Sequence, residues 1–229
     1  DSMLKGKYKT ILLIIFCLLV LSLQVISAQT LPLQDTIIMV DPGHGGRDSG
    51  TYYGETYEKD INLEISKALE EELTKNGAIV YMTRTRDIDL SSIYDSAKKR
   101  GDLYRRLLKI KETKSDLYIS IHINWYQNTS MKGAEVLYNS INENNEKLAK
   151  SIMKEFKTDL GSTRTIKTTD LYMYRNTTTP GVLVECGYLS NPTERTLLQQ
   201  ENYQKKLAKS ITNGIINYLK KEGQIKYVI

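Results

Sequence analysis

The stretch that most constrains this chain is Ile37–Gly46, with the sequence IIMVDPGHGG. Its four apolar residues indicate a buried strand, and Asp41-Pro42 indicates the end of that strand, because proline cannot donate to a sheet ladder. The three glycines around His44 predict a tight loop that allows a ligand to approach closely. Ligands of α/β sheets bind at the carboxyl ends of strands, so His44 is a candidate ligand residue. The alternative is a tight turn with a surface histidine.

The first 28 residues have the pattern of an export signal. Three lysines precede an almost wholly apolar run over residues 11–26, and Ser27-Ala28 fits a cleavage site. The run is slightly short for a membrane-spanning helix, which needs about 20 residues, so a signal peptide is favoured over a signal anchor. Either reading predicts export across the cytoplasmic membrane, with the chain secreted or anchored on the outer face. Contact with the membrane is expected only through this segment.

Charge and cysteine content exclude several other classes of protein. The net charge is +5, and no basic patch interleaved with aromatic residues occurs, so nucleic-acid binding is not expected. Of the two cysteines, Cys17 lies in the export signal. The remaining Cys186 has no internal disulfide partner and is expected to pack as a small buried residue.

Strand and helix patterns alternate along the rest of the chain, which predicts a single three-layer α/β domain with a mixed, mostly parallel sheet flanked by helices. The expected boundaries are a linker at 29–35, the domain at 36–222 and a C-terminal tail at 223–229. Strands are expected at 36–41, 78–83, 116–121, 133–138, 171–175 and 182–185. Helices are expected at 58–76, 97–114, 144–160 and 203–221, with a short one after Asn191. The charges of the basic helix at 97–114 are expected to form a solvated face.

The two histidines of the chain, His44 and His122, each follow an apolar strand, and Glu185 ends a third one. In a parallel sheet these three residues would meet at one edge, which Glu58 reaches from the start of the first helix. Two histidines and a carboxylate with an open fourth position are the ligands of a catalytic zinc site, and a further glutamate is the base that hydrolysis needs. The alternative is two unrelated histidines and two ordinary glutamates.

Two other catalytic classes fit the sequence poorly. The glycine loop has no Gly-Lys-Ser/Thr and lacks the third glycine of the dinucleotide fingerprint, so it does not indicate a nucleotide site. The chain also has no Gly-x-Ser-x-Gly motif. A serine or cysteine triad would use one histidine as its base and leave the other unexplained.

From about Thr36 to Lys221 the chain resembles the zinc-dependent N-acetylmuramoyl-L-alanine amidases of the family-3 type. The resemblance rests on six motifs that occur in the family's order: VDPGHGG at 40–46, EKDINL at 58–63, TR at 83–84, SIHIN at 120–124, GAEV at 133–136 and LVECGYLSN at 183–191. The compact form, a single catalytic domain behind an export signal, is most similar to the sporulation amidases of endospore formers.

The resemblance implies a role for each site residue. His44, Glu58 and His122 would bind one Zn²⁺, and Glu185 would be the catalytic base. Arg175 stands where relatives often have an arginine that faces the substrate, so it is the second predicted catalytic residue.

The resemblance also implies the reaction and its setting. The chain would hydrolyse the amide bond between N-acetylmuramic acid and L-alanine in peptidoglycan. The sporulation type implies spore-cortex maturation through muramic-lactam formation, hence germination, and a location between the forespore membranes. Peptidoglycan is the expected partner, together with an accessory protein. A zinc peptidase acting on peptidoglycan peptides and a non-catalytic wall-binding module are the alternatives.

Overall fold

We describe a computed structural model, which defines residues 11–16 and 31–223. The described residues 32–223 belong to one compact unit. Residues 11–16, which lie outside that unit, are helical. Among the described residues, no helix has both the length and the apolar character needed to span a bilayer. Most of the predicted export signal and C-terminal tail lies outside the described residues.

A six-stranded sheet forms the centre of the domain, in the order β4-β1-β5-β8-β6-β7. Every neighbouring pair is parallel except β6 and β8, which are antiparallel. The mixed, mostly parallel sheet predicted from the sequence is therefore confirmed. The strands are β1 (Ile37–Pro42), β4 (Ile79–Met82), β5 (Leu117–Asn124), β6 (Glu135–Tyr138), β7 (Lys167–Thr168) and β8 (Gly181–Tyr188).

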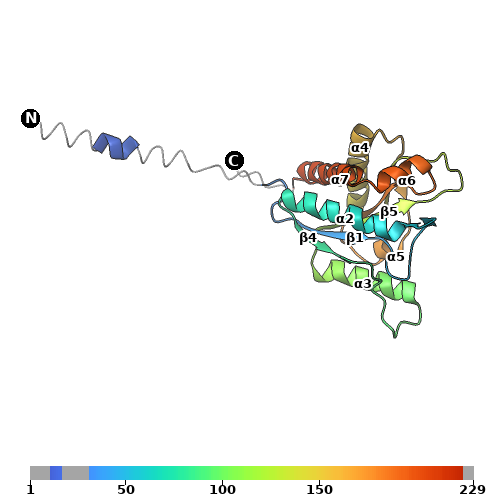
Figure 1. Ribbon diagram of the computed structural model, residues 1–229. Coiled ribbons are helices and arrows are strands. Elements are labelled where there is room, and N and C mark those ends of the chain that lie inside the picture. Colours follow the sequence, from blue (N-terminus) through green and yellow to red (C-terminus); the bar gives the residue numbers. More distant parts are fainter. Residues whose placement is uncertain (1–10, 17–30, 224–229) are drawn as a thin grey trace, which may run out of the picture. The chain divides into compact units, whose positions relative to one another are not determined.

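Helices cover both faces of the sheet and complete the three layers (Figure 1). On one face lie α2 (Glu58–Lys75), α4 (Glu143–Leu160) and α7 (Glu201–Lys221). On the other lie α3 (Lys98–Glu112) and the single turn α5 (Tyr172–Arg175). The short helix α6 (Pro192–Leu198) begins after an Asn191 side-chain cap, with proline in its first turn as predicted. A small hairpin, β2 (Tyr52–Tyr53) and β3 (Thr56–Tyr57), leads into α2.

The apolar core has two parts, one on each side of the sheet. The larger lies against α2, α4 and α7 and includes Ile65, Ile152 and Ile211, each fully buried. The smaller, on the α3 and α5 side, consists of Met39, Ile110, Tyr118, Met173 and Leu183. Helices and strands both contribute to each part, so burial of one apolar face holds each helix to the sheet.

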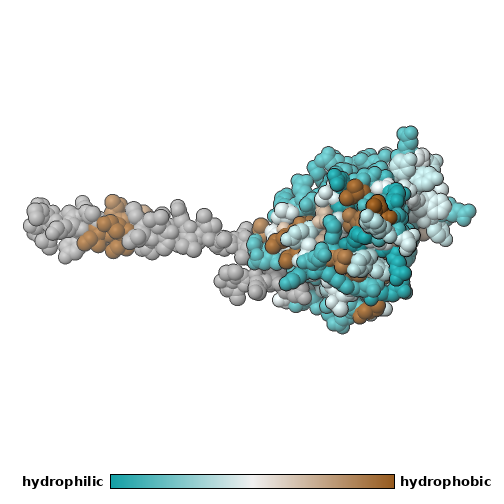
Figure 2. Space-filling model, turned by 90° about the horizontal axis from the view of Figure 1, so that it is seen from below, coloured by the Kyte–Doolittle hydropathy of each residue, from teal (hydrophilic) through white to brown (hydrophobic). Residues whose placement is uncertain are grey.

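The face of the domain drawn in Figure 2 carries its apolar residues in separate groups. In the view of Figure 2, hydrophobic residues form small patches among hydrophilic ones, with no continuous apolar face. Cys186 is a free thiol in the core, as predicted.

Two predicted segments have a different structure. The strand expected at 171–175 is wrong: the segment forms α5, in which the Arg175 amide donates to the Leu171 carbonyl. Leu171 and Met173 are apolar residues with the alternating spacing of a strand. The edge of the sheet beside β6 is occupied by β7, however, and the helical turn buries Met173 in the smaller core. Leu33, within the range predicted as a linker, is fully buried in the larger core, so the folded region includes it.

Candidate metal centre

His44 lies in the glycine loop directly after β1, in a backbone conformation that is rare for residues with side chains. Its φ is 61°, in the left-handed region. Such a conformation persists only where neighbouring groups hold it, and it concentrates at functional sites. Here the buried Arg106 side chain donates a hydrogen bond of 2.6 Å to the His44 carbonyl.

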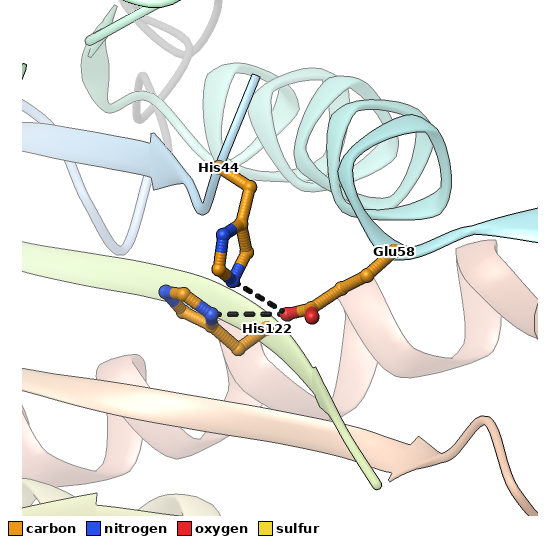
Figure 3. A group of neighbouring side chains, drawn as sticks. All are labelled: His44, Glu58 and His122. Atoms are coloured by element: carbon orange, nitrogen blue, oxygen red, sulfur yellow. Dashed lines mark hydrogen bonds and ion pairs between the residues drawn. The ribbon is translucent and has the colours of Figure 1, made fainter. Parts of the chain in front are cut away.

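Glu58 joins His44 and His122 in one cluster. Its Oε1 lies 3.2 Å from His44 Nε2 and 3.1 Å from His122 Nδ1. The three side chains come from the glycine loop, the start of α2 and β5, and they point toward one another (Figure 3). One donor atom from each residue lies within 4.8 Å of the other two. The structure therefore brings together the three residues predicted to bind the metal.

Backbone amides and charges hold Glu58 in its ionised form. Its Oε2 accepts from the Thr51 amide at 2.8 Å, and its Oε1 accepts from the Ile123 amide at 3.2 Å. Burial alone would raise the pKa of Glu58, but hydrogen bonds and charge interactions with His122 and His44 outweigh it and lower the pKa well below its usual range. The carboxylate is thus available as a ligand.

The electrostatics at His44 also favour a cation. Asp48 Oδ1 lies 3.0 Å from His44 Nδ1, a placement that orients a metal-binding imidazole and raises its basicity. Burial lowers the pKa of His44, but Glu58 and Asp48 outweigh burial and raise it, so positive charge is stabilised here. Two imidazoles and one carboxylate, with room for a fourth ligand, fit a catalytic zinc ion.

Glu185 lies beside His122 on the neighbouring strand. The two residues are register partners of the parallel pair β5 and β8. Glu185 Oε2 is buried and has no hydrogen-bond partner among the described residues. Burial, together with the charges of Glu58 and Glu135, raises the pKa of Glu185 to about 8. A carboxylate that binds a proton this readily is suited to accept and return one near neutral pH.

A cavity of about 320 Å³ opens next to this cluster. Its lining includes His44, His122 and Glu185, so the candidate ligands and base face the same space. Its other wall, formed by residues of α3, α5 and the sheet, is mostly apolar and includes Leu103, Leu137, Leu171, Met173 and Leu183. An apolar pocket with a few convergent polar groups is the usual form of a small-molecule site.

Two buried arginines hold the glycine loop in place. Arg84 donates to the carbonyls of Pro42 at 3.0 Å and Gly43 at 3.0 Å. Arg106 donates to the Pro42 carbonyl at 2.7 Å and forms ion pairs with Asp41 at 2.8 Å and Asp102 at 2.7 Å. The prediction that the charges of the helix at 97–114 are all solvated is therefore wrong for Arg106, which is 1% exposed.

A second buried carboxylate, Glu135, supports the opposite side of the site. It is the register partner of Glu185 across β6 and β8. The Tyr188 hydroxyl donates to its Oε1 at 2.7 Å, and Lys167 Nζ lies 2.7 Å from its Oε2. Asn124, two residues after His122, also donates to Glu135, at 2.9 Å. Glu135 thereby links the strands that carry His122 and Glu185.

The structure refines the predicted positions of two site residues. His122 and Glu185 were expected at strand ends, but each lies inside its strand, two and three residues before the end of β5 and β8 respectively. The sheet continues past them because Leu189 donates to the Asn124 carbonyl beyond the bulge. The predicted convergence of the parallel strands holds.

Arg175 is placed apart from the other predicted site residues. It ends α5 with an exposed side chain, and its Nε lies 3.1 Å from Asp170 Oδ1. It lines a separate groove with Ile141 and Lys111 rather than the cavity of His44. Its role toward substrate stays a prediction.

Acid should destabilise the domain through Asp41. Burial raises its pKa, but Arg106, Thr83 and Ser120 together lower it below 3.8. A carboxyl whose pKa is lower in the folded state than in the unfolded state stabilises the fold at pH values above its unfolded-state pKa. This stabilisation is lost as the pH falls through the folded-state pKa. It amounts to about 1.4 kcal/mol for each pH unit between the two pKa values. We expect the free energy of unfolding in urea to fall below pH 4, and to fall less steeply in Asp41→Asn. Equal slopes for both proteins would contradict this role of Asp41.

Replacing Gly43 should displace His122. A Cβ on Gly43 would lie 2.3 Å from His122 Cε1, so the imidazole would have to move. We expect Gly43→Ala to weaken metal affinity about 10- to 100-fold, as loss of ligand-orienting contacts does. Competition with a chelator measures this affinity. The control is Gly54→Ala, where φ is 57° and a Cβ strains the backbone but would meet nothing within 4 Å; equal metal affinity of both variants would contradict the steric argument.

Comparison with known proteins identifies the family of this chain. The chain matches the N-acetylmuramoyl-L-alanine amidase family over residues 38–217. It is 40% identical over 199 residues to the germination-specific N-acetylmuramoyl-L-alanine amidase of Bacillus subtilis, covering 85% of this chain and 84% of that protein. It is 31% identical to the amidase LytC of the same organism, covering 82% of this chain and 36% of LytC.

Solved structures show the same fold. The CwlD amidase from Clostridioides difficile, in complex with the GerS lipoprotein, has 33% identity and a TM-score of 0.77, covering 81% of this chain and 99% of that one. The catalytic domain of CwlV, an N-acetylmuramoyl-L-alanine amidase from Bacillus (Paenibacillus) polymyxa, has 30% identity and a TM-score of 0.71, covering 81% and 98%. With the family match over most of the domain, these likenesses show that the chain belongs to the N-acetylmuramoyl-L-alanine amidases.

Proposed function

We propose that this chain is a zinc-dependent hydrolase of the amide bond between N-acetylmuramic acid and L-alanine in peptidoglycan. The observation that carries the proposal is the cluster of His44, Glu58 and His122 beside the half-buried Glu185, in a domain of this family. A binding module would not need Glu185, since its buried Oε2, which has no hydrogen-bond partner among the described residues, costs free energy that binding alone does not repay.

His44, Glu58 and His122 would hold the zinc ion, each through one donor atom. When bound, zinc supplies Lewis-acid activation of water and of the scissile carbonyl. Asp48 keeps the His44 imidazole oriented, and the amides of Thr51 and Ile123 keep Glu58 in place.

Glu185 would act as general base and then as general acid. Its carboxylate faces the cavity next to His122, where it would accept a proton from the attacking water. The same group would return the proton to the departing alanine nitrogen. Its pKa, raised by burial and by Glu58, favours both transfers near neutral pH.

We also propose a role in germination, at the spore cortex, through muramic-lactam formation. The relative at 40% identity is a germination-specific amidase, and the chain covers most of it. The likeness to an amidase solved with the lipoprotein GerS supports an accessory protein partner for this chain as well. Action on peptidoglycan requires a location outside the cytoplasmic membrane, and the space between the forespore membranes fits this role.

The release of new alanine amino groups tests this function. Hydrolysis at the proposed bond exposes the amino group of L-alanine, which end-group labelling of purified peptidoglycan detects. We expect the amount of labelled alanine to increase when peptidoglycan is incubated with the zinc-loaded chain. We expect no increase when the chain has first been treated with a chelator. Labelling confined to other amino acids would refute the amidase and favour the peptidase.

A further inference from the structure

Lys99 is a cation at the mouth of the metal cavity. It is the second residue of α3 and lines the cavity together with His44 and Asp48. Its side chain is 73% exposed, and its Nζ lies 3.8 Å from Asp48 Oδ2, beyond hydrogen-bond distance. The ammonium group is therefore open to an anionic ligand that enters from solvent.

The other cations at this rim are already bound to partners. Arg106 is buried between Asp41 and Asp102. Arg47 binds Asp89 and Ser91, and Lys98 donates to the carbonyls of Ser92 and Ile93. Among the described residues that line the cavity, Lys99 is an exposed cation whose anionic neighbour, Asp48, lies beyond hydrogen-bond distance.

The charge of Lys99 matters because the cavity is rich in carboxylates. Asp41 and Asp102 line it and are paired with Arg106, whereas Asp48 and Glu185 line it without an arginine partner among the described residues. A ligand carboxylate at the Asp48 side of the mouth would be repelled unless a cation offsets those charges. Lys99 is positioned to supply that offset.

The substrate of the proposed amidase carries such a carboxylate. L-alanine supplies the amine of the scissile bond. The next residue of the stem peptide is D-glutamate, whose side-chain carboxyl forms the link to the rest of the peptide. The α-carboxylate of that glutamate is thus free, one residue and about 4 Å along the chain from the alanine. Lys99 lies on the same side of the cavity as His44, because Asp48 contacts both residues.

We propose that Lys99 is a specificity-determining residue that binds the free α-carboxylate of the second stem-peptide residue. The proposal rests on the proposed amidase function for the choice of peptide. The apolar wall at Leu103, Met173 and Leu183 would take the alanine side of the same peptide, so the stem peptide would lie along α3. Peptides in which this carboxylate is amidated would bind less well.

Binding of two product dipeptides tests the proposal without requiring turnover. L-alanyl-D-glutamate has a carboxylate at the α-position of its second residue, whereas L-alanyl-D-isoglutamine has a carboxamide there. Titration followed by NMR measures both dissociation constants, including weak ones. We expect the acid to bind about fivefold more tightly than the amide to the wild-type chain, and the ratio to fall with salt, as for exposed ion pairs.

Substitutions on α3 assign the preference to one residue. Lys99→Gln should reduce the ratio to about one, and Lys99→Glu should reverse it, as expected for an exposed charge pair. The control Arg100→Gln removes the same charge one residue along, outside the metal cavity, and should keep the ratio. Equal affinities in the wild type, or a preference that survives Lys99→Gln, would overturn the proposal. Those results leave the amidase itself untouched, since alanine release measures it separately.

Discussion

Glu185→Gln should lower the turnover number about 10²- to 10⁴-fold, the usual contribution of a general base. Glutamine keeps the size of the side chain but cannot accept the proton at neutral pH. Because Glu185 is outside the cluster of His44, Glu58 and His122, zinc content should stay at the wild-type level. Stability should not fall, because the substitution removes a buried carboxylate without a hydrogen-bond partner.

The experiment compares turnover, bound zinc and the free energy of unfolding in the same preparations. His44→Ala serves as the contrasting variant, since it should lose zinc together with activity. Full activity of Glu185→Gln would refute its role as base. Loss of zinc from Glu185→Gln would instead make it a ligand.

Arg106→Leu should lower the free energy of unfolding by about 3–5 kcal/mol, the usual cost of breaking a buried ion pair. It leaves Asp41 and Asp102, both almost fully buried, without their shared cation. The carbonyls of Pro42 and His44 also lose a donor. The loop that carries His44 should loosen, so metal affinity should fall as well.

Arg105→Leu is the matched control on the same helix. Arg105 pairs with Asp95 at 2.6 Å, but its side chain is 34% exposed, so its loss should cost much less than the loss of Arg106. Urea unfolding at neutral pH measures both variants. Equal costs for the two arginines would contradict the view that Arg106 is a buried support of the metal loop.

Much of the fold follows from local patterns in the sequence. Apolar runs at 37–40, 117–121 and 182–184 predict strands, and helical periodicity between them predicts parallel connections. Once the strands are parallel, their ends must meet at one edge, so the meeting of His44, His122 and Glu185 could be anticipated. The helical turn at 171–175 could not be predicted from the sequence, because short segments take their conformation from the neighbours they pack against.

The supporting residues of the site were harder to foresee. Arg106 is one of several basic residues on a polar helix, and its burial depends on Asp41, which is 65 residues away. The spacing of Asp102 and Arg106, four residues apart, is a signal that could have marked this pair. Glu135 likewise depends on Lys167 and Tyr188 from other strands, which the sequence order does not reveal.

Mass spectrometry of muropeptides is the most direct test of the central claim, that this domain cleaves between muramic acid and L-alanine. Purified peptidoglycan is incubated with the zinc-loaded chain, and in parallel with Glu185→Gln. We expect the wild-type chain alone to release intact stem peptides with free alanine amino groups and to leave muramic acid without peptide. Cut cross-links with the stems still attached to muramic acid, or equal products from Glu185→Gln, would contradict it.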